Sequence, residues 1–260
     1  MSSEYLFNIQ TVQSGAFRVL VEALKDILTD CNFIVDKTGI KLIATDNSHN
    51  VLIHMKLKAE NFDYYECKEK ITIGVNMTNM YKLIKTMSNN ETLTLFIDKL
   101  YPNQLGIQMN NNDKNTKTTY KLNLLDIDDE DINIPPASFE TELTLPSSDF
   151  QKLVRDMTNI GEHVEVKSVG STLMFNCNGD FASQETTLGE TQNGLQFSQS
   201  SAPETPIQGI FSLKYLLLFT KCTNMCNQIH MYIKNDYPLV IKYAVANLGD
   251  IKLCLAPNVE

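Results

Sequence analysis

The stretch Leu124–Pro136 reads LLDIDDEDINIPP and divides the chain of 260 residues close to its middle. Five of the six residues 126–131 are acidic, and the stretch ends in two prolines, which lack a backbone N–H donor. Because the acids repel one another and need water, we interpret the stretch as an exposed connector. Its three isoleucines have no use in a solvated linker, so we expect it to lie along a protein surface, across the second domain.

The composition excludes several classes of protein. At 43% hydrophobic residues, the chain can bury a full core and is long enough for two domains. A net charge of −9 argues against bulk attraction to nucleic acid or to an acidic membrane, so such a contact needs a local basic patch. Six scattered cysteines, no signal peptide and no apolar run of membrane-spanning length predict a soluble intracellular protein with reduced thiols and no membrane partner.

The residues that follow the connector repeat the start of the chain. In each half a short strand, at 7–12 and at 139–145, precedes serine and then apolar residues at spacings of three, four and three, which is typical of one helix face. These residues are Phe17, Leu20, Leu24 and Ile27 in the first half, and Phe150, Leu153, Met157 and Ile160 in the second. A hairpin pattern follows each helix, with glycine at the same place, Gly39 and Gly170.

A second helix and the strand after it also repeat, with Leu93, Leu95 and Ile97 matching Ile229, Met231 and Ile233. We therefore predict two copies of one α+β domain, each with two helices on antiparallel sheets. The expected divisions are 1–123, the connector 124–136, and 137–260. The polar stretches Asn110–Thr119 and Thr186–Pro206 are expected to be loops at strand ends.

Basic residues concentrate in the four expected helices, at Ser14–Leu28, Met77–Met87, Ser148–Asn159 and Ser212–Thr223. These segments hold only four acids and eight basic residues, namely Arg18, Lys25, Lys82, Lys85, Lys152, Arg155, Lys214 and Lys221. Lysines occur on any solvated helix face. Four basic helix faces in an otherwise acidic chain, however, indicate a surface that contacts a polyanion from one side. Short helices with so few recognition side chains favour phosphate contact over base reading.

Two groups of residues could indicate catalysis or metal binding. Cys222, Cys226 and His230 have metal-ligand spacing, but we expect His230 to lie on a strand, which removes it from the helix face. Asp46, Ser48 and His49 supply the residue types of a hydrolytic triad without the strand–turn–helix that presents one, so a locally hydrogen-bonded loop is expected. We predict no enzyme activity, no cofactor, no catalytic residue and no metal site.

Several runs closely resemble the proliferating cell nuclear antigen family, the eukaryotic and archaeal DNA sliding clamps. They are VEALKDIL (Val21–Leu28), TDNSHNVL (Thr45–Leu52), FDYYEC (Phe62–Cys67), GVNMTNMYKLIK (Gly74–Lys85), IGEHV (Ile160–Val164), SLKYLLLFTK (Ser212–Lys221), YPLVIKY (Tyr237–Tyr243) and LAPNVE (Leu255–Glu260). The connector looks like the interdomain connecting loop of that family. The Asn-rich composition suggests a divergent member, viral or from a protist.

The resemblance implies a DNA clamp, or processivity fold, in which three copies close into a six-domain homotrimeric ring around double-stranded DNA. The eight basic residues named above fall where the family has its DNA-facing ones. The implied function is processivity for DNA polymerase, with docking of the clamp loader, ligase and flap endonuclease. The implied location is the nucleus, or a viral replication site. Alternatives are a clamp-fold processivity factor or a checkpoint-type clamp subunit that forms no homotrimer.

Partner peptides would enter a pocket under the connector. Carried onto this chain, that pocket would involve His49, Leu52, Asp126, Ile132, Ile134, Pro135, Pro238, Ala256 and Pro257. Thr45 and Cys254 stand where the family has a methionine and a tyrosine, which changes the pocket. Because a duplicated chain leaves a free sheet edge at each end, we expect head-to-tail pairing through the strand of Tyr120 and the segment Phe181–Leu188.

Overall fold

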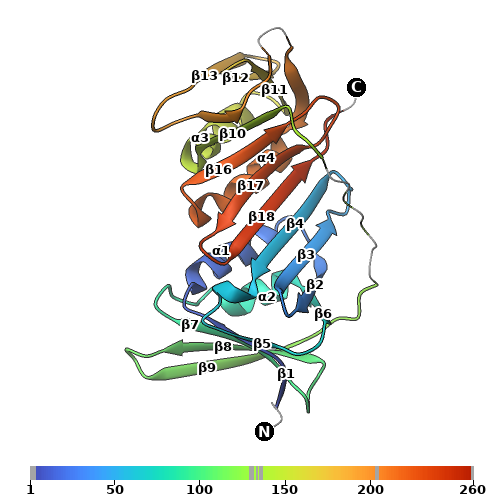
Figure 1. Cartoon of the computed structure of the whole chain (residues 1–260), viewed down its shortest axis with the longest axis vertical. Coiled ribbons are helices and arrows are strands. Elements are labelled where there is room, and N and C mark those ends of the chain that lie inside the picture. The colour runs from blue at the N-terminus through green and yellow to red at the C-terminus, as the bar shows by residue number, and fades with distance from the viewer. Residues whose placement is uncertain (1–3, 129–131, 133, 135–136, 203–204, 259–260) are drawn as a thin grey trace. The chain divides into compact units, whose positions relative to one another are not determined.

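A computed structural model describes residues 4–128, 132, 134, 137–202 and 205–258, and the chain forms two compact units (Figure 1). Unit 1 comprises Met1–Asn47, His54–Ile132 and Ala244–Ile251. Unit 2 comprises Ser48–Ile53, Asn133–Tyr243 and Lys252–Glu260. Strands β4 (Val51–Lys58), β17 (Leu239–Val245) and β18 (Gly249–Leu255) therefore have residues in both units.

Unit 1 carries two helices on antiparallel sheets. Its remaining elements are β1 (Tyr5–Thr11), α1 (Ser14–Leu24), β2 (Asp30–Asp36), β3 (Gly39–Thr45), the 3-10 helix η1 (Ala59–Asn61), β5 (Tyr64–Cys67), β6 (Ile71–Asn76), α2 (Met77–Ile84), β7 (Thr92–Asp98), β8 (Gln104–Asn111) and β9 (Thr116–Asn123). One sheet has the order β5-β1-β7-β8-β9, and a second runs β6-β2-β3-β4. Asn76 caps α2 by accepting a hydrogen bond from the N–H of Asn79.

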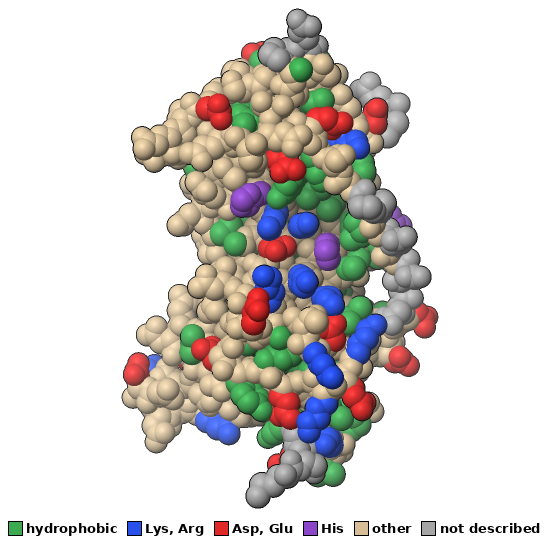
Figure 2. All heavy atoms as spheres, viewed as in Figure 1, with side chains coloured by type: hydrophobic (Ala, Val, Ile, Leu, Met, Phe, Trp, Pro, Cys, Tyr) green, Lys and Arg blue, Asp and Glu red, His purple; other side chains and the backbone are tan. Residues whose placement is uncertain are grey.

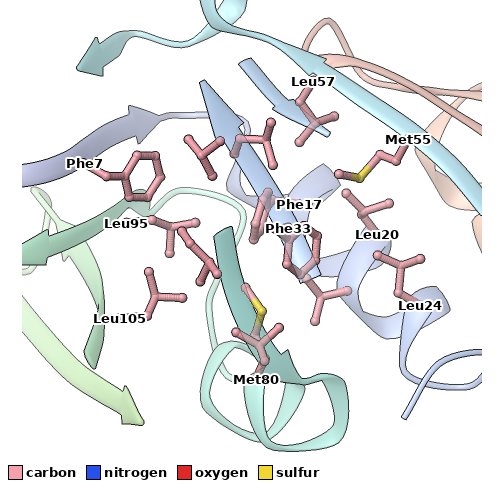
Figure 3. A pocket seen from close by; sticks show the side chains of 15 residues that line it. Phe7, Phe17, Leu20, Leu24, Phe33, Met55, Leu57, Met80, Leu95 and Leu105 are labelled. Atoms are coloured by element: carbon pink, nitrogen blue, oxygen red, sulfur yellow. The ribbon is translucent and has the colours of Figure 1, made fainter. Parts of the chain in front are cut away.

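The core of unit 1 lies between its helices and strands. Figure 3 shows Phe17, Leu20 and Leu24 of α1 pointing toward side chains of the strands, including Phe7 and Leu95. All five side chains are at most 5% exposed. They therefore occupy the inward-facing positions of half-buried strands and of an amphipathic helix. The space between them is a wholly apolar cavity of about 30 Å³, so it is packed core and not a ligand site.

Unit 2 has the same plan. It contains β10 (Thr141–Pro146), α3 (Ser147–Thr158), β11 (His163–Val169), β12 (Thr172–Asn178), β13 (Ser183–Gly189), β14 (Gln196–Gln199), β15 (Ile207–Ser212), α4 (Leu213–Phe219), the 3-10 helix η2 (Thr220–Met225) and β16 (Gln228–Ile233). One sheet has the order β13-β12-β11-β15, and a second runs β14-β10-β16-β17. No helix among the described residues is long and apolar enough to cross a membrane.

Equivalent residues of the two units take equivalent places, which confirms the duplicated α+β domain. The first strand of each unit pairs with the strand after its second helix, with Ile9 opposite Leu95 and Leu143 opposite Met231. Gly39 and Gly170 both close a hairpin with positive φ, 140° and 56°. The shared glycine therefore reflects a backbone conformation that L side chains rarely adopt.

Several expectations about element bounds were wrong, and α2 and α4 also end earlier than expected, at Ile84 and Phe219. Helix α1 ends at Leu24, so Ile27 lies beyond it in a turn in which the N–H of Ile27 bonds to the carbonyl of Leu24. Strands β8 and β9 occupy most of the stretch 110–119 that was expected to be a loop, and β13 and β14 lie within 183–199. Strands β9, β13 and β14 lie at the edges of their sheets, where strands need no apolar alternation, so polar residues conceal them in the sequence.

Candidate functional site

The four basic residues that were predicted in the helices of unit 1 lie on or just after its two helices. Two of them, Arg18 and Lys25, have partners within the unit. Arg18 donates hydrogen bonds from its guanidinium to the carbonyl of Met87 and to Asn89 Oδ1. Lys25 follows the last residue of α1, and its Nζ lies 2.7 Å from Asp26 Oδ1 and 4.8 Å from the ring centroid of Tyr81. These contacts leave less of either charge for an external anion.

The other two basic residues predicted in the helices of unit 1, Lys82 and Lys85, are exposed. Lys82 is in the last turn of α2, where a cation also suits the helix dipole. Lys85 is the residue that follows α2, so both stand at one end of this helix.

The four basic residues predicted in the helices of unit 2, Lys152, Arg155, Lys214 and Lys221, are all exposed. The apolar residues of α3 are buried, so its two cations occupy the opposite face of the helix. Lys214 Nζ lies 5.5 Å from the ring centroid of Tyr215 on α4. Lys221 is on the 3-10 helix η2 and not on α4, because α4 ends at Phe219.

Three other lysines of unit 1 lie near an acidic side chain that is close in sequence. Lys41 lies 2.8 Å from Asp36, and Lys58 and Lys68 each lie 3.7 Å from a glutamate close in sequence. Figure 2 accordingly shows basic side chains among acidic ones on the face in view.

A groove of about 470 Å³ runs beside the first part of the connector in unit 1. Its lining residues are Asp30, Cys31, Asn32, Ile34, Ile43, Ala44, Thr45, Asn47, Lys70, Ile127, Asp128 and Ile132. Apolar side chains of β2 and β3 form its floor and acids stand at its rim, so the groove suits an apolar peptide segment with a basic flank. Burial raises the pKa of the Cys31 thiol to about 12, so this thiol is neutral at physiological pH.

The first residues of the connector lie on unit 1, which differs from the expectation that the connector lies across the second domain. The N–H of Leu125 donates to the carbonyl of Gly74 at 2.8 Å, and Asn32 Nδ2 donates to the carbonyl of Ile127 at 3.0 Å. Gly74 is needed here because a Cβ would come within 2.2 Å of the Leu125 carbonyl oxygen. The cause is that β6 is the last strand of its sheet and has backbone groups open to the connector, which sequence patterning did not reveal.

The predicted pocket residues are distributed over both units. Asp126 is exposed and Ile132 half-buried in unit 1, whereas Ile134 is half-buried in unit 2. Unit 2 also holds the half-buried Leu52 on β4 and the residues His49, Pro238, Ala256 and Pro257. Pro135 lies outside the described residues.

A smaller pocket of about 200 Å³ in unit 2 joins the loop at 48–50 to the C-terminal segment. The N–H of Ala256 donates to the carbonyl of Asn50 at 2.9 Å. Tyr215 Oη lies 2.7 Å from Ser48 Oγ and accepts from Asn50 Nδ2 at 3.1 Å. His49, which lies between Ser48 and Asn50 in the sequence, has a φ of 56°. The chain therefore turns in this loop through a left-handed residue.

Sequence reasoning missed an aromatic cluster in unit 2. The ring of Phe139 lies 5.4 Å from that of Tyr232 and 5.6 Å from that of Tyr237, centroid to centroid. Tyr237 directly precedes the predicted pocket residue Pro238, and Lys234 Nζ lies 5.6 Å from the Tyr237 ring. The only signal in the sequence was an aromatic residue next to a predicted pocket proline. These half-buried rings suit an apolar or aromatic anchor of a peptide.

The predicted subunit-contact residues lie at sheet edges. Tyr120 is on β9, which is the last strand of its sheet, and Leu188 is on β13, which is the last strand of a sheet in unit 2. Phe181 precedes β13 and is 78% exposed, which is unusual for a large apolar side chain. Both strands therefore have one row of backbone groups open to a further strand.

The residues considered for chemistry have structural environments. Cys222 is fully buried, which raises its pKa well above the usual range, and His230 lies exposed on β16. Ser48 contacts Tyr215, as described above. In the part of the chain that the structure describes, no cluster of three His, Cys, Asp or Glu side chains could hold a metal ion, and none of the six cysteines forms a disulfide.

Comparisons with known proteins agree with this geometry. Family models match two parts of the chain: the N-terminal domain of proliferating cell nuclear antigen at residues 6–131, and its C-terminal domain at 133–258. A protein described as "Probable DNA polymerase sliding clamp 1", from Paramecium bursaria Chlorella virus 1, is 34% identical over 256 residues, 97% of each chain. "Proliferating cell nuclear antigen" of Chaetomium thermophilum is 32% identical over 249 residues, 95% of this chain and 96% of that protein.

Proposed function

This chain belongs to the proliferating cell nuclear antigen family, and on that premise we propose that it is a DNA sliding clamp that encircles duplex DNA as a homotrimer. Members of this family are scaffolds and not enzymes. The clamp would hold DNA polymerase on its template by topology and would dock a clamp loader, ligase and flap endonuclease. It would act in the nucleus, or at a viral replication site.

The observation that carries this proposal is the repetition of exposed cations on the helices of both units. Lys82 and Lys85 in unit 1, and Lys152, Arg155 and Lys214 in unit 2, stand on or beside helices whose apolar faces are buried. Long flexible side chains on short helices can touch phosphate oxygens without reading bases. Such contacts are weak and independent of sequence, as a protein that moves along DNA requires.

Partner docking is supported by two features that are described separately for the two units. Unit 1 has the groove beside the connector, which includes Ile132. Unit 2 has the aromatic cluster and the polar pocket between Asn50 and Ala256. We propose that a short peptide with one aliphatic and two aromatic anchors binds these surfaces, with micromolar affinity because only a few hundred Å² would be buried.

Ring closure is supported by the unlike open edges β9 and β13. Edge strands are normally covered or paired, and a contact between two different edges continues from copy to copy and forms a ring where the rotation between copies closes. We propose that β9 of one copy pairs antiparallel with β13 of the next.

The test combines mass with topology. Light scattering should give three times 29.4 kDa. The assembled protein should remain on nicked circular DNA but leave linear DNA by its ends, and affinity for short duplexes should be equal for different sequences. Each phosphate contact should contribute about −0.9 to the slope of log K against log salt. A monomer at micromolar concentration would instead favour a clamp-fold factor that forms no homotrimer, and a clear sequence preference would contradict sliding.

A further inference from the structure

The side chains of β9 and β13 select one register for the contact between copies. This inference rests on the proposed head-to-tail ring and goes further, because it assigns which residues face one another. In β9, Tyr120 and Leu122 lie opposite the buried Ile107 and Leu105 of β8. Alternation then places Lys117 and Lys121 on the other face of the sheet, and both are exposed.

Strand β13 shows the same division. Leu188 and Thr186 lie opposite the buried Leu173 and Phe175 of β12, so they share the buried face of their sheet. Glu185 points to the other face and is exposed. Among the described residues, neither Glu185 nor Lys117 makes an ion pair within its own chain. The two edges therefore carry opposite charges on the same side of a continued sheet.

We propose that Lys117 of one copy lies directly opposite Glu185 of the next copy. In an antiparallel pair, each step forward on one strand is a step back on the other, so this register pairs Thr119 with Ser183 and brings Lys121 to the turn before β13 that carries Phe181. Lys121 Nζ already lies 4.6 Å from the ring centroid of Tyr101, which is itself 53% exposed. The exposed Phe181 ring would then cover the Lys121 stem and the Tyr101 ring, which gives these apolar groups a partner.

Neighbouring registers would give fewer of these charged and aromatic side chains a partner. A shift of one residue would pair the buried-face side chains of one strand with the outer-face side chains of the other. Tyr120 and Leu122 would then have to turn to the outer face, away from the buried residues that they contact. A shift of two residues would place Lys117 opposite Thr187 or Ser183, and no cation would face Glu185. The occupant of this surface is thus a second copy of the chain, recognised by one charge pair and one aromatic contact.

A charge-exchange experiment tests the register. Lys117→Glu and Glu185→Lys, made singly, should each raise the protein concentration at which the trimer half-dissociates about three- to tenfold, because like charges would face one another at every contact. The double variant should return to within about twofold of wild type. As a matched control, Lys121→Glu combined with Glu185→Lys should show no such restoration. The readout is the mass distribution in sedimentation velocity over a dilution series.

Several results would overturn the register. If the Lys121→Glu pair restored the trimer and the Lys117→Glu pair did not, the true register would differ by four residues. If the single variants dissociated like wild type, the proposed charge pair would be wrong. A wild-type chain that stays monomeric would sink the ring itself, which separates failure of the proposed function from failure of the register. Phe181→Ser should also weaken the trimer, whereas Val12→Ser, at another exposed apolar position, should not.

Discussion

Tyr215 Oη lies 2.7 Å from Ser48 Oγ, so a hydroxyl on helix α4 holds the loop that precedes β4 although the two residues are 167 positions apart. Asn50 Nδ2 lies 3.1 Å from both of these oxygens. The carbonyl of Asn50 in turn accepts from the C-terminal segment. Tyr215 therefore fixes the loop that carries His49 and borders the polar pocket.

We expect Tyr215→Phe to weaken binding of the anchor peptide by about two- to tenfold, because each lost hydrogen bond of this kind contributes about 0.5–1.5 kcal/mol to the ordered loop. Isothermal titration calorimetry would measure this. Tyr64→Phe is the matched control, since the Tyr64 hydroxyl bonds only to Glu66 at an exposed site in unit 1. An equal loss in both variants would contradict a positioning role for Tyr215.

Changing Ile132 and Ile134 together to serine should abolish peptide binding without altering the mass of the assembly. Both side chains are half-buried, and Ile132 lines the groove in unit 1, so serine removes apolar contact area that a peptide would use. Calorimetry and light scattering on the same sample provide the two readouts. Unchanged affinity in the double variant would mean that peptides dock elsewhere.

Arg18→Ala should lower the free energy of unfolding by about 1–3 kcal/mol, because it removes a charged donor from the part-buried Met87 carbonyl. Lys82→Ala, at an exposed position on α2, should stay within about 0.5 kcal/mol of wild type. Urea denaturation measures both. Retention on DNA should show the opposite pattern. Lys152→Ala should reduce retention more than Arg18→Ala does, since the cation of Lys152 is exposed.

The two hairpin glycines should differ in their sensitivity to alanine. Gly170→Ala should cost about 1–2 kcal/mol for a left-handed residue at φ 56°. Gly39→Ala should cost more, because its Cβ would come within 1.9 Å of the Leu57 carbonyl oxygen, which is backbone and cannot move aside. Thermal unfolding of the two single variants compares them, and equal shifts would contradict the steric argument.

The stability of unit 1 should depend on pH through Asp36. The hydrogen bond from Lys41 first, and those from Thr38 next, hold the pKa of this carboxyl well below its usual range. A depressed carboxyl pKa stabilises the folded state above the ordinary value near 3.9, and that contribution is lost as pH falls toward the folded-state pKa. Asp36→Asn should therefore flatten the acid limb of the stability profile below about pH 5, followed by circular dichroism. A limb as steep as that of wild type would assign the acid sensitivity to other carboxyls.

Local patterns predicted the repeated parts of the fold. The spacings in α1 and α3, the alternation at Leu95 and Met231, and the glycines of the hairpins depend only on neighbouring residues. Each was correctly placed except for the last residue of each helix spacing, Ile27 and Ile160, which lie beyond the helix ends. The exact end of α1 was not predictable, because apolar spacing continues through the turn after Leu24.

Long-range contacts were the part that the sequence concealed. Asn32 holds the carbonyl of Ile127 from 95 positions away, and Arg18 contacts Met87 from 69 positions away. Neither contact requires a special residue type or spacing, so nothing local indicates that the connector begins on unit 1 or that Arg18 is partly engaged. For the same reason the prediction of the pocket came from family resemblance, whereas that of the phosphate-contacting residues came from the basic residues in the expected helices. Both stay predictions.

The unlike edges of the chain also determine what symmetry an assembly can have. A twofold dimer would have to place β9 against β9, lysine against lysine, or β13 against β13, glutamate against glutamate, and each choice would leave the other edge uncovered. Head-to-tail addition instead gives a rotation axis that relates every copy without inverting any. Each loop at 48–50 and each C-terminal segment would then point to the same side, so such a ring would have two chemically different faces and partners could tell which way it faces along the duplex.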